Sequence, residues 1–169
     1  VVEELEDHGT VVEYPNPGAE AVVGSFHLEV LGPLRRYASL NDGSLVVMVR
    51  SSGASVLLAG DIEAIAQLEI GTTRADVLKV PHQGAATSDL EWLAEVGARI
   101  AVISVGPNSF GHPSAEVIAA LEAAGGRVLR TDLVGDVVIH LDRLEAVRRV
   151  ARHRYGGGDE VRPRRRRPP

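Results

Sequence analysis

Apolar residues fall into short runs separated by polar turns, and the spacing within each run predicts its secondary structure. Within 22–31, Phe26, Leu28 and Val30 stand at every second position, which predicts a strand. The β-branched runs at 44–50 and 54–59 predict two more strands, and the Ser52-Gly53 pair between them indicates a hairpin turn. Further buried-type strands are predicted at 75–80, 100–105, 127–131 and 136–141.

Helical patterns lie between the later strands. Apolar residues at 62–70 follow helical spacing. Ser88 is expected to begin a second helix, because Glu91 three residues later completes a capping box. The clearest helical pattern is 115–124, with Ser114 as its expected N-cap. This order of strands and helices predicts a layered sheet protein of the α/β or α+β class.

The net charge of −5 conceals two parts of opposite sign. Residues 1–142 contain 20 acidic and 8 basic residues, whereas residues 143–169 contain 3 acidic and 10 basic residues. We therefore expect one domain at 1–142, since domains commonly hold about 100–200 residues, and a basic tail at 143–169. A short basic helix is expected from about Arg143, and the Gly-, Pro- and Arg-rich composition predicts disorder from Gly156.

The composition excludes several kinds of site. The chain has no cysteine, so a disulfide framework, a thiolate metal site and a cysteine nucleophile are all excluded. No apolar run reaches the roughly 18 residues of a membrane-spanning helix, and the chain does not open on a signal peptide. The sequence therefore leaves localisation open. Because the first residue is not Met, we expect the chain to begin inside a longer protein, with a processed or trimmed chain as the alternative.

Two single polar residues follow directly on predicted buried strands. Asp61 comes after the strand ending in Ala59-Gly60, where a carboxylate is suited to bind a metal but also to cap the next helix. His82 follows the strand 75–80, and imidazole is both a common metal ligand and the usual acid or base near neutral pH. The ends of strands in layered sheets are where sites are commonly built.

The segment 103–113 is a third candidate. It concentrates Gly and Pro with Ser104, Asn108 and His112 between a buried strand and a helix. Backbone N–H groups near a helix N-terminus attract phosphate or carboxylate, and the side chains of Asn108 and His112 can add donors. An ordinary turn with a proline near the start of the helix is the alternative interpretation.

Five sequence blocks occur in an order that points to one family. In sequence they are NDGSLVV (41–47), VLLAGD (56–61), ADVLKVPHQG (75–84), ISVGPNSFGHP (103–113) and RTDLVGDV (130–137). In this order the chain resembles the C-terminal metallo-β-lactamase-like domain of ComEC-type competence proteins, the channels for DNA uptake. The resemblance runs from about residue 20 to about residue 141.

The resemblance implies a fold, an activity and a set of site residues. The fold would be the second half of an αββα sandwich, and the activity metal-dependent hydrolysis of phosphodiester bonds in DNA, with manganese or zinc as the cofactor. Asp61 would correspond to the bridging metal ligand, and His82 to the first histidine of the family's His-His-Gly-Ser block. His112, with Asn108 and Ser104, would line the catalytic site and contact phosphate or donate a proton. The parent family resides in the inner membrane, which makes its channel domain an expected partner.

The chain departs from the family pattern in two places. The main metal motif of the family, His-x-His-x-Asp-His, lies upstream of the matched region, and no His-x-His occurs in this chain. The His-His-Gly-Ser block is represented by His82-Gln83-Gly84-Ala85. Because a catalytic zinc site commonly has three protein ligands, we expect the chain alone to be inactive. Without the N-terminal half of the sandwich, it is also expected to expose an apolar sheet face.

Three interpretations follow from these observations. In the first, the chain is part of a metal-dependent nuclease, with Asp61 and His82 as ligands. In the second, it is a catalytically dead remnant of that fold, structural or binding nucleic acid through Arg164–Arg167, although such a run can also be a solvated terminus. In the third, it is an unrelated α/β module whose loop at 104–113 binds a small anion.

Overall fold

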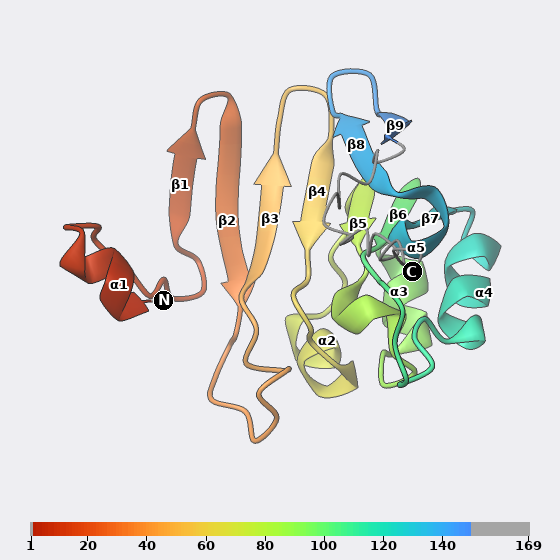
Figure 1. Ribbon diagram of the computed structural model, residues 1–169, viewed down its shortest axis with the longest axis horizontal. Coiled ribbons are helices and arrows are strands. Elements are labelled where there is room, and N and C mark those ends of the chain that lie inside the picture. The colour runs from red at the N-terminus through yellow and green to blue at the C-terminus, as the bar shows by residue number, and fades with distance from the viewer. Residues whose placement is uncertain (1, 150–169) are drawn as a thin grey trace, which may run out of the picture.

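The computed structural model describes residues 2–149, in which the strands form one large sheet and one small one (Figure 1). The large sheet has seven strands in chain order, from β1 at one edge to β7 at the other, and β8 pairs with β9 in the small sheet. The bounds of the strands are β1 Glu20–Val23, β2 Phe26–Gly32, β3 Val46–Arg50, β4 Ser55–Leu58, β5 Val77–Lys79, β6 Ile100–Ile103, β7 Arg127–Arg130, β8 Asp136–His140 and β9 Glu145–Arg149.

Helices connect the strands of the second half of the sheet. The strands β1 to β4 pair antiparallel, and β4 to β7 pair parallel. Parallel neighbours need a crossover, which α2, α3 and α4 supply in turn. The carboxyl ends of β4 to β7 therefore meet at one edge of the sheet. The bounds of the helices are α1 Val2–Asp7, α2 Ala64–Ile70, the short 3₁₀ turn η1 Pro81–Gly84, α3 Leu90–Glu95, α4 Ala115–Ala123 and α5 Thr131–Val134.

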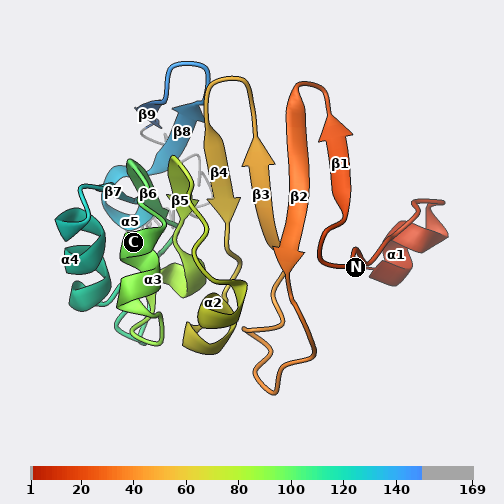
Figure 2. The ribbon, with the colours of Figure 1, turned by 180° about the vertical axis from the view of Figure 1, so that it is seen from behind.

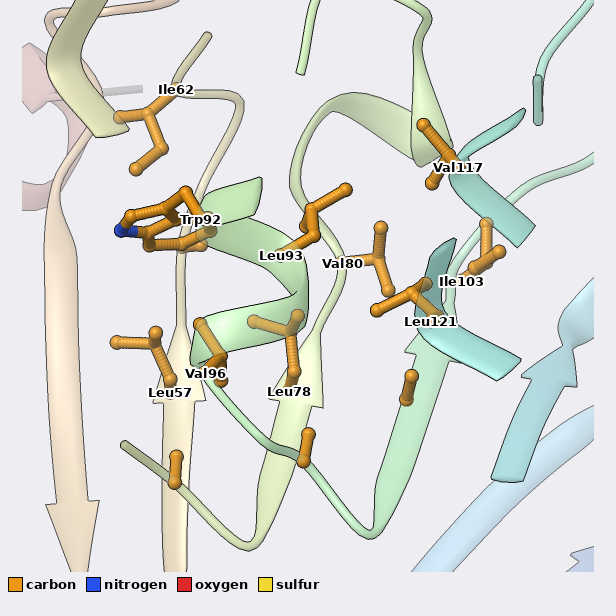
Figure 3. Close-up of a cluster of buried hydrophobic side chains, with 14 of the residues drawn as sticks. Leu57, Ile62, Leu78, Val80, Trp92, Leu93, Val96, Ile103, Val117 and Leu121 are labelled. Atoms are coloured by element: carbon orange, nitrogen blue, oxygen red, sulfur yellow. The ribbon is translucent and has the colours of Figure 1, made fainter. Parts of the chain in front are cut away.

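The main core lies between one face of the sheet and the helices α2 to α4. Leu57 on β4 and Leu78 on β5 are fully buried there, beneath Trp92 of α3 and Leu121 of α4 (Figure 3). The indole Nε1 of Trp92 donates a hydrogen bond of 3.0 Å to the carbonyl oxygen of Gly71, so the buried ring keeps a polar partner. Burying a leucine side chain such as that of Leu57 or Leu78 contributes about 1.5–3 kcal/mol to the stability of the fold.

The opposite face of the sheet is covered only over its parallel strands. Val77, Ile100 and Leu129 of the parallel strands pack against β8, chiefly through Val137 and Ile139. Figures 1 and 2 show α2 to α4 and the β8–β9 pair lying along the part of the sheet from β4 to β7, whereas β1 and β2 extend beyond them.

Apolar side chains remain exposed on the antiparallel part of this face. Val23, Phe26 and Leu58 are 60%, 40% and 42% exposed. Val23 pairs with Phe26 in the register, and the face continues through Leu58, which pairs with Val47. Val30, which pairs with Val47 on the same face, is buried, so the exposure is confined to part of the face. Within residues 2–149, no helix is long and apolar enough to cross a membrane.

The mixed α/β class and several local predictions are confirmed. Ser114 caps α4, and its hydroxyl accepts a hydrogen bond of 3.2 Å from the backbone N–H of Glu116. The prediction for Ser88 was wrong, because Asp89 caps α3 and its carboxylate accepts a 2.7 Å hydrogen bond from the backbone N–H of Trp92. Ser88 is buried instead and lies 3.4 Å from the amide nitrogen of Gln67.

Two other predictions for secondary structure were wrong. The single strand expected at 22–31 is a hairpin of β1 and β2, which reverses at Gly24-Ser25 with a positive φ of 60° at Gly24. The helix expected from Arg143 is strand β9, which pairs antiparallel with β8. The disorder predicted from Gly156, and with it the run Arg164–Arg167, lies outside the described residues.

Candidate functional site

The ends of β4 and β5 bring Asp61 and His82 to adjacent positions. The strands are parallel neighbours, so the segments that leave their carboxyl ends run side by side. The carbonyl oxygen of Gly60 accepts hydrogen bonds from the backbone N–H of His82 at 3.3 Å and from Nζ of Lys79 at 3.0 Å. Lys79 Nζ also lies 3.7 Å from Oδ1 of Asp61. The two predicted ligand residues are therefore tied together through one carbonyl group.

A glycine makes the turn before Asp61 possible. Gly60 has a φ of +55°, and a Cβ there would lie 2.6 Å from Cβ of Ser44. The hydroxyl of Ser44 accepts a 3.1 Å hydrogen bond from the backbone N–H of Asp61. Neither the backbone conformation nor the space allows a larger residue, so this close approach fixes where the carboxylate of Asp61 leaves the sheet.

The turn that carries His82 has an uncommon backbone. His82 and Gln83 have φ values of 44° and 55°. The left-handed conformation costs non-glycine residues about 1–2 kcal/mol each. Strained residues of this kind cluster at functional sites. The backbone of η1 thus marks His82 as a candidate functional position independently of its side chain.

Glu63 faces His82 and was not among the residues predicted from the sequence. Oε1 of Glu63 lies 3.2 Å from Nδ1 of His82. This nitrogen is buried, and the pair lacks the alignment of a hydrogen bond. Asn41 Nδ2 and Ser39 Oγ each lie 3.4 Å from a carboxylate oxygen of Glu63. The backbone N–H of Glu63 donates a 2.8 Å hydrogen bond to the buried carboxylate of Asp42.

The surroundings of Glu63 favour its ionised form. Burial acts to raise the pKa of the carboxyl group, but hydrogen bonds from Thr87 and Asn41 and the neighbouring ring of His82 outweigh it. The pKa of Glu63 therefore lies below its ordinary value, and the group is a carboxylate at neutral pH. A weak sequence signal existed, since Glu63 stands two residues after Asp61 and Asn41 opens the block 41–47.

The loop after β6 brings His112 against His82. Their ring centroids are 5.3 Å apart at an interplanar angle of 61°. On its other side, His112 stacks on Phe110, with centroids 5.8 Å apart and an angle of 20°. Two of the three predicted histidine and carboxylate positions are therefore in direct contact. Ser104 is exposed immediately after β6.

Asn108 holds this loop together. Its amide nitrogen donates to the carbonyl oxygens of Gly106 and His112 at 3.0 and 2.9 Å. Its amide oxygen accepts hydrogen bonds of 3.1 Å from the backbone N–H groups of Phe110 and His112. The side chain predicted to line the site thus braces the backbone around His112.

Gly84 joins the loop to η1. Its φ is +77°, and a Cβ there would lie 2.7 Å from Cβ of Pro113. Its carbonyl oxygen accepts a 2.8 Å hydrogen bond from the backbone N–H of Ser114. The contact between His82 and His112 therefore depends on this close packing of two backbone segments.

The described residues include donors of the kind that bind metal ions, but too few of them for a complete centre. A carboxylate at Asp61 and an imidazole at His82 are suitable donors for zinc or manganese. Within residues 2–149, however, no group of three or more His, Asp or Glu side chains is arranged to hold a metal ion. Two donors fall short of the three protein ligands of a catalytic zinc site. These residues alone do not fit a complete metal centre.

The chain is similar to parts of several competence proteins. It is 31% identical over 144 residues to ComE operon protein 3 of Bacillus subtilis, covering 81% of this chain and 19% of that protein. It is 34% identical over 126 residues to Recombination protein 2 of Haemophilus influenzae, covering 70% and 16%. It is 33% identical over 110 residues to competence protein ComA of Neisseria gonorrhoeae, covering 61% and 16%. The chain thus spans at most about a fifth of the length of these relatives.

A solved structure shares the fold. A protein from Parabacteroides distasonis, named a metal-dependent hydrolase, matches with a TM-score of 0.50 at 17% identity, covering 76% of this chain and 60% of that one. At this identity the likeness concerns the fold. No family model matches the chain. Taken with the competence relatives, these findings show that the chain is a ComEC-like domain with a metallo-β-lactamase-like fold.

Proposed function

We propose that the chain is the C-terminal half of a metal-dependent hydrolase domain that cleaves DNA phosphodiester bonds during DNA uptake. The observation that carries the proposal is that Asp61 and His82 follow adjacent parallel strands. The carbonyl oxygen of Gly60, directly before Asp61, accepts a 3.3 Å hydrogen bond from the backbone N–H of His82. The similarity to competence proteins supplies the DNA-uptake context.

The side chains would divide the chemistry among them. Asp61 and His82 would hold a divalent cation, manganese or zinc, together with donors from residues upstream of Val1. Such an ion supplies Lewis-acid activation of a phosphoryl oxygen when bound. His112, which packs against His82, would contact the phosphate or donate a proton. Asn108 shapes the backbone around His112, and Ser104 lines the same edge of the sheet.

The exposed sheet face supports a missing half. Val23, Phe26 and Leu58 present apolar surface on the antiparallel strands. In a two-sheet sandwich such a face is covered by the second sheet. An upstream segment of the longer protein would cover it and bring the remaining metal donors, and the membrane channel domain of that protein would be a further partner. On this proposal the chain alone is inactive.

A catalytically dead remnant is the second candidate, and two observations favour it. Lys79 Nζ lies 3.7 Å from the carboxylate of Asp61, where it can take the place of a cation. Gln83 stands where the family has its second histidine, and an amide cannot act as a general acid. Under this alternative the fold serves a structural role or binds nucleic acid.

The test is metal binding by the longer protein that includes the upstream residues. Manganese affinity is measured by calorimetry for the unmodified protein and for Asp61→Ala and His82→Ala. Both substitutions are expected to weaken binding by about tenfold or more, the scale on which even supporting residues of metal sites act. Asp136→Ala and His140→Ala on β8 remove the same side chains elsewhere and serve as matched controls. Unchanged affinity in the Asp61 and His82 variants would favour the remnant.

A further inference from the structure

We propose that Glu63 is a positioning residue that keeps the proton of the neutral His82 ring on Nδ1 and thereby leaves Nε2 as the free nitrogen. In an unperturbed imidazole either nitrogen can carry the proton, and the neighbours of the ring decide between the two tautomers. In His82, the Glu63 carboxylate lies beside Nδ1 and favours the tautomer that is protonated there.

The first step is the environment of Nδ1. This atom is buried, and Oε1 of Glu63 lies 3.2 Å from it. If Nδ1 were unprotonated, its lone pair would face a negatively charged oxygen, which is repulsive. If Nδ1 carries the proton, the N–H dipole points at the carboxylate, which is attractive even without ideal alignment. The His82 and Glu63 side chains are only 24% and 22% exposed, so solvent screens this difference weakly.

The second step is that the Glu63 carboxylate is itself held in place. Asn41 and Ser39 approach its two oxygens from the loop before β3. The buried carboxylate of Asp42 accepts a 2.8 Å hydrogen bond from the backbone N–H of Glu63, which fixes the residue at the start of α2. The loop before β3 thus holds both the backbone and the carboxylate of Glu63 beside His82.

The third step is that the His82 ring is held too. It packs edge-to-face with the His112 ring at a centroid distance of 5.3 Å. The close approach of Gly84 and Pro113 keeps the two loops together. A ring flip that would present Nε2 to Glu63 has to disturb this packing, so the orientation and the tautomer support each other.

The consequence for function rests on the proposed role of His82 as a metal ligand. The tautomer itself does not depend on that role. An imidazole that donates one N–H to a carboxylate presents its other nitrogen as a more basic ligand in metal sites. Fixing the proton on Nδ1 would make Nε2 the atom of His82 that binds a cation or exchanges a proton. Glu63 would then contribute to the site without touching the substrate.

The experiment is nitrogen NMR of the histidine rings in the ¹⁵N-labelled chain, at a mildly alkaline pH where ordinary histidines are neutral. Long-range ¹H–¹⁵N correlations distinguish a protonated from an unprotonated ring nitrogen, and the signals of His82 are assigned by their loss in His82→Gln. We expect a protonated Nδ1 and an unprotonated Nε2 in the unmodified chain. A protonated Nε2 overturns the proposal directly, without any variant.

Two matched variants test the cause. Glu63→Gln preserves the shape of the side chain but removes its charge, and the two nitrogen shifts of His82 are expected to move toward those of a tautomer mixture. Glu69→Gln makes the same change on α2, where Glu69 bonds Arg35 instead, and should leave His82 unchanged. If Glu63→Gln leaves the shifts unchanged, Glu63 does not set the tautomer. A failure here leaves the metal role of His82 intact, and a failure to bind metal leaves the tautomer result intact.

Discussion

The contact between η1 and the His112 loop can be tested at one glycine. In Gly84→Ala, the new Cβ would lie 2.7 Å from Cβ of Pro113. Real Cβ atoms essentially never come this close to another atom, and the rigid proline ring cannot turn away. Gly84 also has a positive φ of +77°. The substitution therefore combines backbone strain with an overlap between the two segments that bring His82 and His112 together.

The two costs can be separated with a second glycine. A left-handed alanine costs about 1–2 kcal/mol, and overpacking of this kind costs a further 1–3 kcal/mol, roughly. Gly125 has a φ of +87° and nothing within 4 Å of its hypothetical Cβ. Gly125→Ala is thus expected to lower the free energy of unfolding by about 1–2 kcal/mol, and Gly84→Ala by about 2–5 kcal/mol.

Chemical denaturation measures both values in the same chain. Trp92 is the single tryptophan and is 3% exposed, so its fluorescence reports the unfolding of the core. A ring-to-ring nuclear Overhauser effect between His82 and His112 provides a local readout, expected to weaken in Gly84→Ala and to persist in Gly125→Ala. If Gly84→Ala is no more destabilising than Gly125→Ala and the effect persists, the packing described at Pro113 is refuted.

Further predictions concern stability. Asp76→Asn should lower the free energy of unfolding by about 1–3 kcal/mol in urea denaturation, because the carboxylate accepts hydrogen bonds of 2.9 Å from both the backbone N–H and the hydroxyl of Ser55. These bonds hold the pKa of Asp76 below its ordinary value. The stabilisation from Asp76 is therefore present above the unfolded-state pKa and is lost as pH falls through the folded-state pKa. The difference in free energy of unfolding between the unmodified chain and Asp76→Asn should shrink on acidification, and a difference that grows would contradict this. Leu78→Ala, at a fully buried site, should cost about 2–5 kcal/mol, whereas Leu68→Ala, at a side chain 64% exposed, should stay within about 0.5 kcal/mol.

Local patterns predicted the parts of the fold whose signals lie close together in the chain. Ser114 and the helix after it were identified because a cap and its helix are neighbours in sequence. Asp61 and His82 were singled out because each follows a buried strand, and the parallel pairing of β4 with β5 then places them side by side. The parallel pairing thus brings two separate local signals to neighbouring strand ends.

Other features depend on contacts that no local pattern contains. Glu63 gains its place in the site from Asn41 and His82, which lie 22 and 19 residues away in the chain. The hairpin at Gly24 was missed because the period-two pattern of Phe26, Leu28 and Val30 lies within β2 and does not show where β1 ends. Strand β9 was missed because its edge position depends on β8, its pairing partner, rather than on its own basic sequence.

The central claim is that this chain is one half of a metal-dependent hydrolase domain, and the coding sequence upstream of Val1 tests it most directly. The account predicts an in-frame His-x-His-x-Asp-His motif within roughly one half-domain of Val1, preceded by apolar membrane spans, since domains commonly hold about 100–200 residues. Asp61 and His82 would then have the upstream donors that they need. A stop codon, or an unrelated sequence without that motif, would contradict the account and leave a fold of this kind without its metal centre.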